Sequence, residues 1–217
     1  KVSNKTLEEW LEELTAGMGA KGALTLATGH PRWIVDAWAN VLPEDELEAA
    51  LEADNVPPVP TLVVRPGLCE RDELLDQGGR PTPYSPFGVI REGNPSDLAA
   101  VRQRRAAVQD EGSQLVALAL SRVDAEPGRW LDLCAGPGGK AALLVGLAQQ
   151  DGSTLLANEA HEHRTDLVRK ALMAYPQNLW SVQTGDGTQP NWEPGSFTRV
   201  MADVPCSGLG ALRRRPD

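Results

Sequence analysis

The sequence predicts an α/β fold: a parallel β-sheet with helices on both faces, preceded by a helical region. After residue 128, short apolar segments of strand character alternate with longer helical patterns, and the connections between them are short. The first of these segments leads into a glycine-rich turn, which is typical of the ligand crevice in an open α/β sheet. Before residue 60, by contrast, apolar residues recur at helical spacing.

Three helices are expected in residues 1–58. Thr6 and Glu9 fit a capping box at the start of the first helix. Pro31 suits the first turn of the second helix, and the third is expected at residues 43–54. The apolar residues that these helices are expected to bury, tryptophans included, are Leu7, Trp10, Leu11, Leu14, Trp33, Ile34, Ala37, Trp38, Leu47 and Leu51.

A small α+β region is expected at residues 59–107. The β-branched run at residues 61–65 predicts a strand, and residues 70–77 predict a short helix. Residues 78–96 are rich in Gly and Pro, so we expect a loop there with one strand at residues 88–90.

The alternating pattern falls in the third expected region, residues 108–217, which opens with a helix at residues 109–119. The strands that follow are expected at residues 129–134, 153–157, 179–184 and 199–203, and the helices between them at residues 141–149 and 164–174.

The net charge of −9 is concentrated at the beginning of the chain. Residues 1–60 carry −7, whereas residues 61–130 and 131–217 carry −1 each. The remainder also holds two basic clusters, residues 102–105 and Arg213 to Arg215. The overall acidity therefore does not exclude a nucleic-acid partner.

Composition points to a cytoplasmic protein. Hydrophobic residues make up 41%, but no run approaches the roughly 18 apolar residues of a membrane span. The opening segment is charged, unlike a signal peptide. Three cysteines are too few and too scattered for a disulfide framework or a zinc site. We expect a monomer with no membrane partner and no metal.

The glycine-rich turn, LDLCAGPGGK at residues 131–140, is open to three interpretations. A Walker A loop would need glycine at Cys134 and Ser or Thr at Ala141. A dinucleotide-binding turn, G-x-G-x-x-G, is met at Gly136 and Gly138, while Ala141 takes its third glycine position, a replacement that is sometimes tolerated. S-adenosylmethionine needs a tight turn without a phosphate cradle, and it is the third interpretation.

Acidic residues follow the later expected strands. Glu159 ends the second strand, where a carboxylate would suit the ribose hydroxyls of either a dinucleotide or S-adenosylmethionine. Asp186 and Asp203 end the third and fourth strands. One such residue could simply cap the next helix, but three beside this turn favour a ring of carboxylates around one cofactor.

Together these motifs resemble the RsmB/Sun (Fmu) family of ribosomal RNA cytosine-5 methyltransferases. The resemblance rests on LDLCAGPGGK, on the spacing of Glu159 and Arg164, on the Gly-Asp-Gly sequence at Asp186, and on DVPCSGLGALRRRPD from Asp203. The Pro-Cys pair that ends at Cys206 is the most specific element.

The resemblance covers almost the whole chain. HPRWIV from His30 and NVPP from Asn55 are similar to the family's linker, and VQDEGS from Val108 is similar to its motif before the cofactor turn. It implies a class I S-adenosylmethionine-dependent methyltransferase core, Rossmann-like and truncated at the C-terminus, with a helical linker and a small RNA-facing α+β subdomain.

The implied reaction is methylation of carbon 5 of a cytosine in RNA, with 16S rRNA of the small subunit as the expected substrate. Carbon 5 is a poor nucleophile. In the family, a cysteine thiolate adds to carbon 6, carbon 5 then takes the methyl group, a base removes its proton, and the cysteine is eliminated. The implied cofactor is S-adenosyl-L-methionine, and the implied partner is RNA.

Site residues follow from the matched motifs. Asp203 and Cys206 are the implied catalytic residues, Cys206 assisting product release, and one residue of Arg213 to Arg215 is expected to contact phosphate. Glu159 would bind the ribose hydroxyls and Asp186 the adenine amino group. The implied cofactor-binding residues are Cys134, Ala135, Gly136, Pro137, Gly138, Gly139, Lys140, Glu159, Arg164, Asp186 and Asp203.

One departure from the family concerns the nucleophile. The family carries it in a Thr-Cys pair, and residues 1–217 contain no such pair. Cys134 is expected to line the cofactor pocket and Cys69 to be a packing residue, so neither suits that role. The nucleophile is therefore expected beyond residue 217, and the family's NusB-like RNA-binding domain before Lys1.

Three alternatives stay open from the sequence. A tRNA-directed enzyme of the same superfamily would share every motif. A catalytically silent RNA-binding or ribosome-assembly factor could retain the fold. A nicotinamide-dependent oxidoreductase is disfavoured, because a Pro-Cys pair after the fourth strand has no role in hydride transfer.

Overall fold

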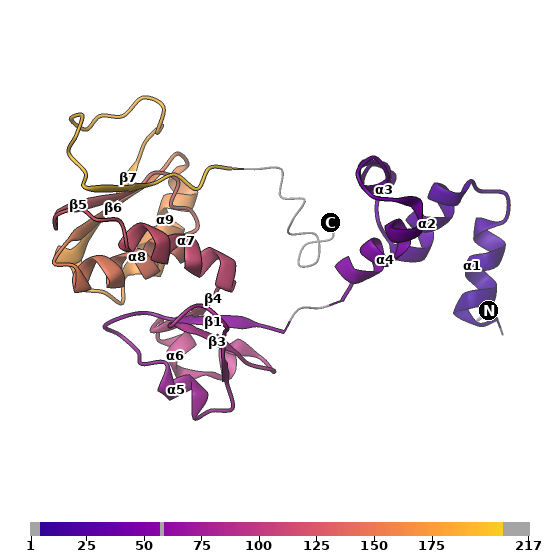
Figure 1. The fold of residues 1–217 in the computed structure, drawn as a ribbon, viewed down its shortest axis with the longest axis horizontal. Helices are drawn as coiled ribbons and strands as arrows, with labels where there is room; N and C mark the ends of the chain where they lie inside the picture. The colour runs from indigo at the N-terminus through magenta and orange to yellow at the C-terminus, as the bar shows by residue number, and fades with distance from the viewer. Residues whose placement is uncertain (1–4, 57–58, 206–217) are drawn as a thin grey trace. The chain divides into compact units, whose positions relative to one another are not determined.

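The computed structural model describes residues 5–56 and 59–205, and these form two compact units that divide between the two ranges (Figure 1). Each unit has a hydrophobic core of its own.

The first unit is helical. Its helices are α1 (Leu7–Thr15), α2 (Ala20–Thr28), α3 (Arg32–Ala39) and α4 (Glu44–Asp54). Ile34 and Val35 of α3 pack against Leu47 and Leu51 of α4. The capping box at the start of α1 is confirmed, since the Thr6 hydroxyl accepts from the Glu9 amide and the Glu9 carboxylate accepts from the Thr6 amide.

Two expectations for the helical unit were wrong. Helix α2 was missed, and the burial of α1 was overestimated: Leu7 is 70% exposed and Trp10 is 50% exposed. Trp33 on α3 is also exposed, whereas Trp38 packs against the core. Among the residues described, α1 packs mainly against α2, so most of its apolar stripe is left uncovered.

The second unit begins with a four-stranded antiparallel sheet in the order β2-β3-β1-β4. Its strands are β1 (Thr61–Val64), β2 (Arg80–Pro81), β3 (Gly88–Ile90) and β4 (Ala106–Val108), and its helices are α5 (Asp72–Leu75), the 3₁₀ turn η1 (Pro95–Asp97) and α6 (Ala99–Arg102). The strands expected at residues 61–65 and 88–90 are present. The sequence did not indicate β2, β4 or α6.

A parallel sheet in the order β7-β6-β5-β8 follows, as the alternating pattern predicts. Its elements are α7 (Glu111–Ser121), β5 (Arg129–Asp132), α8 (Gly139–Gln150), β6 (Thr154–Glu159), α9 (Glu162–Leu172), the 3₁₀ turn η2 (Gln177–Leu179), β7 (Trp180–Thr184) and β8 (Arg199–Met201). The short strands predicted for this half all form, with ends that differ by a few residues.

The helices of the parallel sheet lie on one face. Trp130 of β5 and Met201 of β8 belong to the core that α7, α8 and α9 cover. Leu131 and Val200, which are paired across β5 and β8, lie on the opposite face beside Trp192 and Phe197 of the β7–β8 connection. The expectation of helices on both faces is therefore not met within residues 59–205, where an irregular segment covers the second face.

Helix α8 is the centre of this core. Its residues from Ala141 to Ala148 are all buried, which explains why its sequence is apolar all round rather than amphipathic. No helix in the described part of the chain is long and apolar enough to cross a membrane.

Candidate active site

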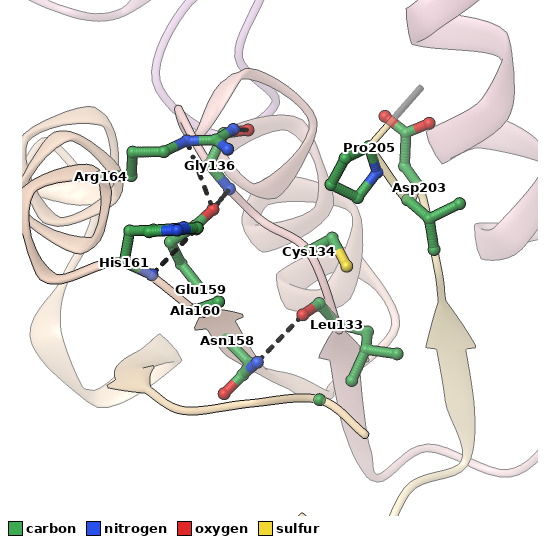
Figure 2. Close-up of a pocket in the computed structure, with 12 residues that line it drawn as sticks. Leu133, Cys134, Gly136, Asn158, Glu159, Ala160, His161, Arg164, Asp203 and Pro205 are labelled. Atoms are coloured by element: carbon green, nitrogen blue, oxygen red, sulfur yellow. Dashed lines mark hydrogen bonds and ion pairs between the residues drawn. The ribbon is translucent and has the colours of Figure 1, made fainter. Parts of the chain in front are cut away.

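A cavity of about 300 Å³ lies at the carboxyl ends of β5, β6 and β8, where α/β sheets bind their ligands (Figure 2). Strand order places three chain segments around it: the glycine turn after β5, the end of β6, and the residues after β8. The lining residues are Leu133, Cys134, Gly136, Asn158, Glu159, Ala160, His161, Arg164, Gly187, Asp203, Val204 and Pro205.

The glycine turn lies close against its neighbours. A Cβ atom on Gly136 would collide with the Glu159 carboxylate and would lie 2.9 Å from Nε of Arg164. Gly138 has φ +107°, and a Cβ there would lie 2.6 Å from Cβ of Ala171 on α9. Both positions therefore require glycine, one for the site and one for the packing of the turn on α9.

Glu159 is the buried carboxylate of the cavity. Its Oε2 accepts from the Gly136 amide at 3.1 Å, and its Oε1 accepts from the His161 amide at 3.1 Å (Figure 2). Arg164 Nε lies 3.6 Å from Oε2, while Arg164 Nη2 donates to the Gly136 carbonyl. Burial alone would raise the pKa of Glu159, but the hydrogen bonds from His161 and Gly136 and the charge of Arg164 outweigh it, so the pKa lies below its usual value.

Asp203, just after β8, forms the second acidic point of the cavity. Its Oδ2 accepts from Nζ of Lys140 at 2.8 Å. Lys140 stands in the first turn of α8, so this ion pair ties the glycine turn to the segment after β8. Half of the Asp203 side chain remains exposed, which leaves the carboxylate available to a ligand.

Asp132, at the end of β5, is a buried carboxylate near the charges of the cavity that the sequence analysis did not select. It is 1% exposed, and neither carboxyl oxygen receives a hydrogen bond of normal geometry from the described residues. Burial raises its pKa to about 7, with the charge of Asp203 adding to the rise and the nearby Cys134 amide and Lys140 opposing it. The signal was an acidic residue inside an apolar strand directly before the glycine turn.

The predicted cofactor residues do not all face the cavity. Cys134, Gly136, Glu159, Arg164 and Asp203 line it. The other residues of the turn play other parts: Ala135 is buried, Pro137 lines a separate groove, Gly138 packs on α9, Gly139 begins α8 and Lys140 pairs with Asp203.

Asp186 does not line the cavity. Its Oδ1 accepts from the Thr188 amide and hydroxyl, which holds the pKa of Asp186 below its usual value, and the side chain is exposed. The neighbouring Gly187 lines the cavity instead. Cys206, the second residue of the Pro-Cys pair, and Arg213 to Arg215 lie outside the described residues. Cys69 is buried, consistent with a packing residue.

The donor set suits S-adenosylmethionine. An ionised carboxylate has about four acceptor positions; the Gly136 amide takes one on Oε2, which leaves one there for a ribose hydroxyl. The cavity holds no lysine and no Walker A phosphate cradle. Within the described part of the chain, no cluster of three or more His, Cys, Asp or Glu residues is arranged to hold a metal ion.

Strand order, the glycine turn and the buried Glu159 define the class: the second unit is a class I S-adenosylmethionine-dependent methyltransferase core, Rossmann-like in its parallel sheet. Residues 117–217 match the family described as 16S rRNA methyltransferase RsmB/F. This match identifies residues 117–217 as an RsmB/F-type methyltransferase domain, whose cofactor is S-adenosylmethionine.

Proteins from several bacteria are similar to this chain in sequence. Rv1407 of Mycobacterium tuberculosis, whose name assigns it provisionally to the methyltransferases, is 45% identical over 224 aligned residues, which cover 100% of this chain and 48% of Rv1407. The ribosomal RNA small subunit methyltransferase B of Pseudomonas putida is 33% identical over 219 residues, covering 95% of this chain and 48% of that protein. The chain spans about half the length of the curated relatives it matches.

Solved structures support the fold. NSun6 from Pyrococcus horikoshii, determined with SFG, superposes with a TM-score of 0.66 at 13% identity, covering 81% of this chain and 71% of its own. A methyltransferase homologue from Pyrococcus horikoshii gives a TM-score of 0.57 at 19% identity, covering 76% of this chain and 55% of its own.

Proposed function

We propose that the full-length protein methylates carbon 5 of a cytosine in RNA, with 16S rRNA as its substrate. The observation that carries this proposal is that Asp203, Val204 and Pro205 line the same cavity as Glu159 (Figure 2). The Pro-Cys motif therefore starts at the wall of the cofactor cavity. The family match and the relatives named for ribosomal RNA methylation support the choice of substrate.

The cofactor, when bound, supplies an electrophilic methyl group. The chain's own task at this end of the cavity is to hold it. We assign the ribose hydroxyls to Glu159, whose ionised carboxylate is already oriented by the amides of Gly136 and His161. Arg164 braces both Glu159 and the Gly136 carbonyl, so it acts as a positioning residue.

Asp203 is assigned to the cytosine. A carboxylate is the natural acceptor for the exocyclic amino group of this base. Lys140 Nζ, 2.8 Å from Oδ2, holds the Asp203 carboxylate in place. The ion pair would also limit where the base edge can lie relative to the glycine turn.

The covalent steps place two cysteines in the reaction. A thiolate would add to carbon 6, and the electron pair of the 5,6 double bond would then form the bond from carbon 5 to the methyl group. The bond from that methyl group to sulfur would break, its electron pair staying on the sulfur of S-adenosylhomocysteine. A base takes the proton from carbon 5, and the thiolate leaves as the double bond re-forms. We assign assistance of that release to Cys206. The nucleophile belongs to a Thr-Cys pair in the family, and residues 1–217 contain none.

The test uses the full-length protein, methyl-labelled S-adenosylmethionine and 16S rRNA transcribed without modifications. We expect label in 5-methylcytosine, and we expect Cys206→Ala to accumulate a covalent protein–RNA adduct that survives denaturing electrophoresis. Cys69→Ala is the matched control: it removes a buried thiol of the antiparallel sheet and should release product normally.

The other outcomes separate the alternatives. Label in tRNA but not in 16S rRNA would move the activity to the tRNA-directed class. Cofactor binding without methylation of either RNA would identify a silent binding factor. Label in 5-methylcytosine without an adduct in Cys206→Ala would remove Cys206 from the release step. A cytoplasmic location and a monomeric state remain predictions.

A further inference from the structure

A second, shallower groove lies on the other side of the glycine turn. Its walls come from the end of α6 and β4 in the antiparallel sheet and from the last turns of α9. Pro137 lines this groove, whereas the preceding Gly136 lines the cofactor cavity. The groove and the cofactor site are therefore separated by one turn of backbone.

The groove is lined by three cations and no carboxylate: Arg65, Arg104 and Lys170. In the described part of the chain, the Lys170 ammonium group makes no ion pair or hydrogen bond, and the Arg104 guanidinium has only the Met173 sulfur as a partner, at 3.1 Å. A thioether is a weak acceptor. Both charges are thus left without an anion.

Their immediate neighbours in the sequence are neutralised. Arg105 forms a bidentate pair with Glu73, at 2.6 and 2.7 Å, and Arg169 pairs with Asp166 at 2.8 Å. In each adjacent pair of cations, the one that lines the groove is the one without a carboxylate. The carboxylates near the groove therefore pair with the neighbouring cations and leave the cations that line the groove unpaired.

Arg65 adds a buried positive charge to the wall of the groove. It is 5% exposed, and its Nη1 donates to the carbonyls of Arg104 and Ala171, both at 2.7 Å. Its Nε is buried and has no partner among the described residues. A buried guanidinium with an unsatisfied donor is costly unless an anion compensates it.

The backbone at Arg104 is a further indication. Among the described non-glycine residues, it alone has a positive φ, +58°. Glycine would adopt this left-handed conformation without strain, whereas the arginine at this position adopts it at a cost in energy. Strain of this kind concentrates at functional positions, and what arginine supplies here is a side chain on the rim of the groove.

The remaining lining is apolar, and two of its larger side chains are exposed. Val108 is 58% exposed and Leu167 is 44% exposed. Exposed apolar side chains between unpaired cations suit a ligand with a charged backbone and flat apolar faces, which describes a single strand of nucleic acid.

We propose that this groove binds the phosphate backbone of a single-stranded segment of the RNA substrate, with Arg104 and Lys170 as the phosphate contacts over the fixed charge of Arg65. The inference rests on the proposed function, because it assigns a path to the same RNA. It adds a binding surface that is separate from the cofactor cavity and adjoins it through the Gly136–Pro137 turn.

The test measures binding of a fluorescein-labelled oligouridylate of about 16 nucleotides to the full-length protein by anisotropy across a salt series. Lys170→Gln and Arg104→Gly should each weaken binding about threefold to tenfold and reduce the slope of log K against log salt by about 0.7, and the double variant by about twice that. Arg169→Gln is the matched control, since it removes one charge from the adjacent position of α9 and should leave the slope unchanged.

Arg104→Gly guards against misfolding, because it relaxes the backbone while it removes the charge. Cofactor affinity, measured by calorimetry on each variant, reports whether the core is intact. Unchanged RNA affinity and slope in both groove variants, with wild-type RNA binding intact, would overturn the groove and leave the proposed function standing. A wild-type protein that binds cofactor but no RNA would overturn both.

Discussion

The two sides of the glycine turn treat charge in opposite ways. In the cofactor cavity, Glu159 and Asp203 are each held by a cation, Arg164 and Lys140. In the groove beyond Pro137, cations line the surface without any carboxylate. Charges paired in advance orient a ligand, whereas unpaired charges supply attraction to a ligand of opposite sign. On the proposed assignments, the same turn separates a site that positions the cofactor from a surface that attracts the phosphate backbone of RNA.

Asp132 tests how the cofactor cavity accommodates a carboxylate that is not paired with a cation. It lies among the charges of Asp203, Glu159 and Lys140 and has no ion pair of its own within the described residues. The cavity tolerates it because burial keeps it largely protonated up to about pH 7.

Asp132→Asn should give the largest effect. The folded pKa is raised from 3.8 to about 7, so between these values the unfolded chain is ionised and the folded protein is not. This group therefore makes the wild-type protein less stable as pH rises from about 4 to about 7, on the order of 4 kcal/mol in total, and no further above that.

Asparagine does not titrate in this range, so the stability of Asp132→Asn relative to wild type should increase from pH 4 to pH 7 and then level off. Urea unfolding of the cofactor-free protein at several pH values measures this difference, in which the titration of all other carboxyls cancels. A difference that is constant with pH would mean that Asp132 is ionised in the fold and paired in some other way.

Gly136→Ala should have the next largest effect. Its Cβ would collide with the Glu159 carboxylate, so the ribose acceptor must move. We expect cofactor affinity to fall about a hundredfold, the upper part of the range for overpacked sites. Calorimetry with S-adenosylmethionine measures it.

Gly139→Ala is the control within the same turn, since a Cβ there meets no atom within 4 Å and alanine suits the first turn of α8. Its affinity should stay close to wild type. If Gly136→Ala bound the cofactor as well as Gly139→Ala does, Glu159 would not be the ribose acceptor.

Arg104→Gly should cause the smallest of the three changes, a change in the free energy of unfolding. Removing a side chain from a left-handed residue relieves roughly 1–2 kcal/mol, and the added freedom of glycine in the unfolded chain offsets part of it. We expect a net gain of about 0.5–1 kcal/mol in urea unfolding, together with the weaker RNA binding predicted above.

Arg102→Gly places the same change inside α6, where the backbone is helical and Arg102 Nη1 donates to the carbonyls of Ser96 and Asp97. It should lower the unfolding free energy by about 1 kcal/mol. A loss of stability in Arg104→Gly as well would show that the side chain, not the backbone, decides this position.

The sequence best predicted the features that depend only on a short segment of the chain. The strands of the parallel sheet and the glycine turn were predictable, because apolar runs and glycine requirements are local properties of the chain. Burial was less predictable: Trp10 and Trp33 are exposed although they sit at helical spacing. Periodicity identifies the apolar face of a helix, but which face is covered depends on what packs there.

The candidate site divides along the same line. Residues 131–140, Glu159 and the Asp203 to Cys206 block were indicated by their positions at expected strand ends, since parallel strands bring their carboxyl ends to one edge. Asp186 occupies such a position too, yet its carboxylate accepts from Thr188 of its own turn and does not line the cavity.

The amino-acid sequence alone was sufficient for the class of fold, the family resemblance and the selection of five residues that line the cavity, because these depend on short motifs and on strand order. Only the tertiary structure decided that Asp132 is buried with no ion pair among the described residues, that Lys140 pairs with Asp203, and that Arg65 reaches Ala171 across the groove. Those facts join residues far apart in the chain. The energy of a charge depends on its distance from other charges and from water, and packing sets both distances.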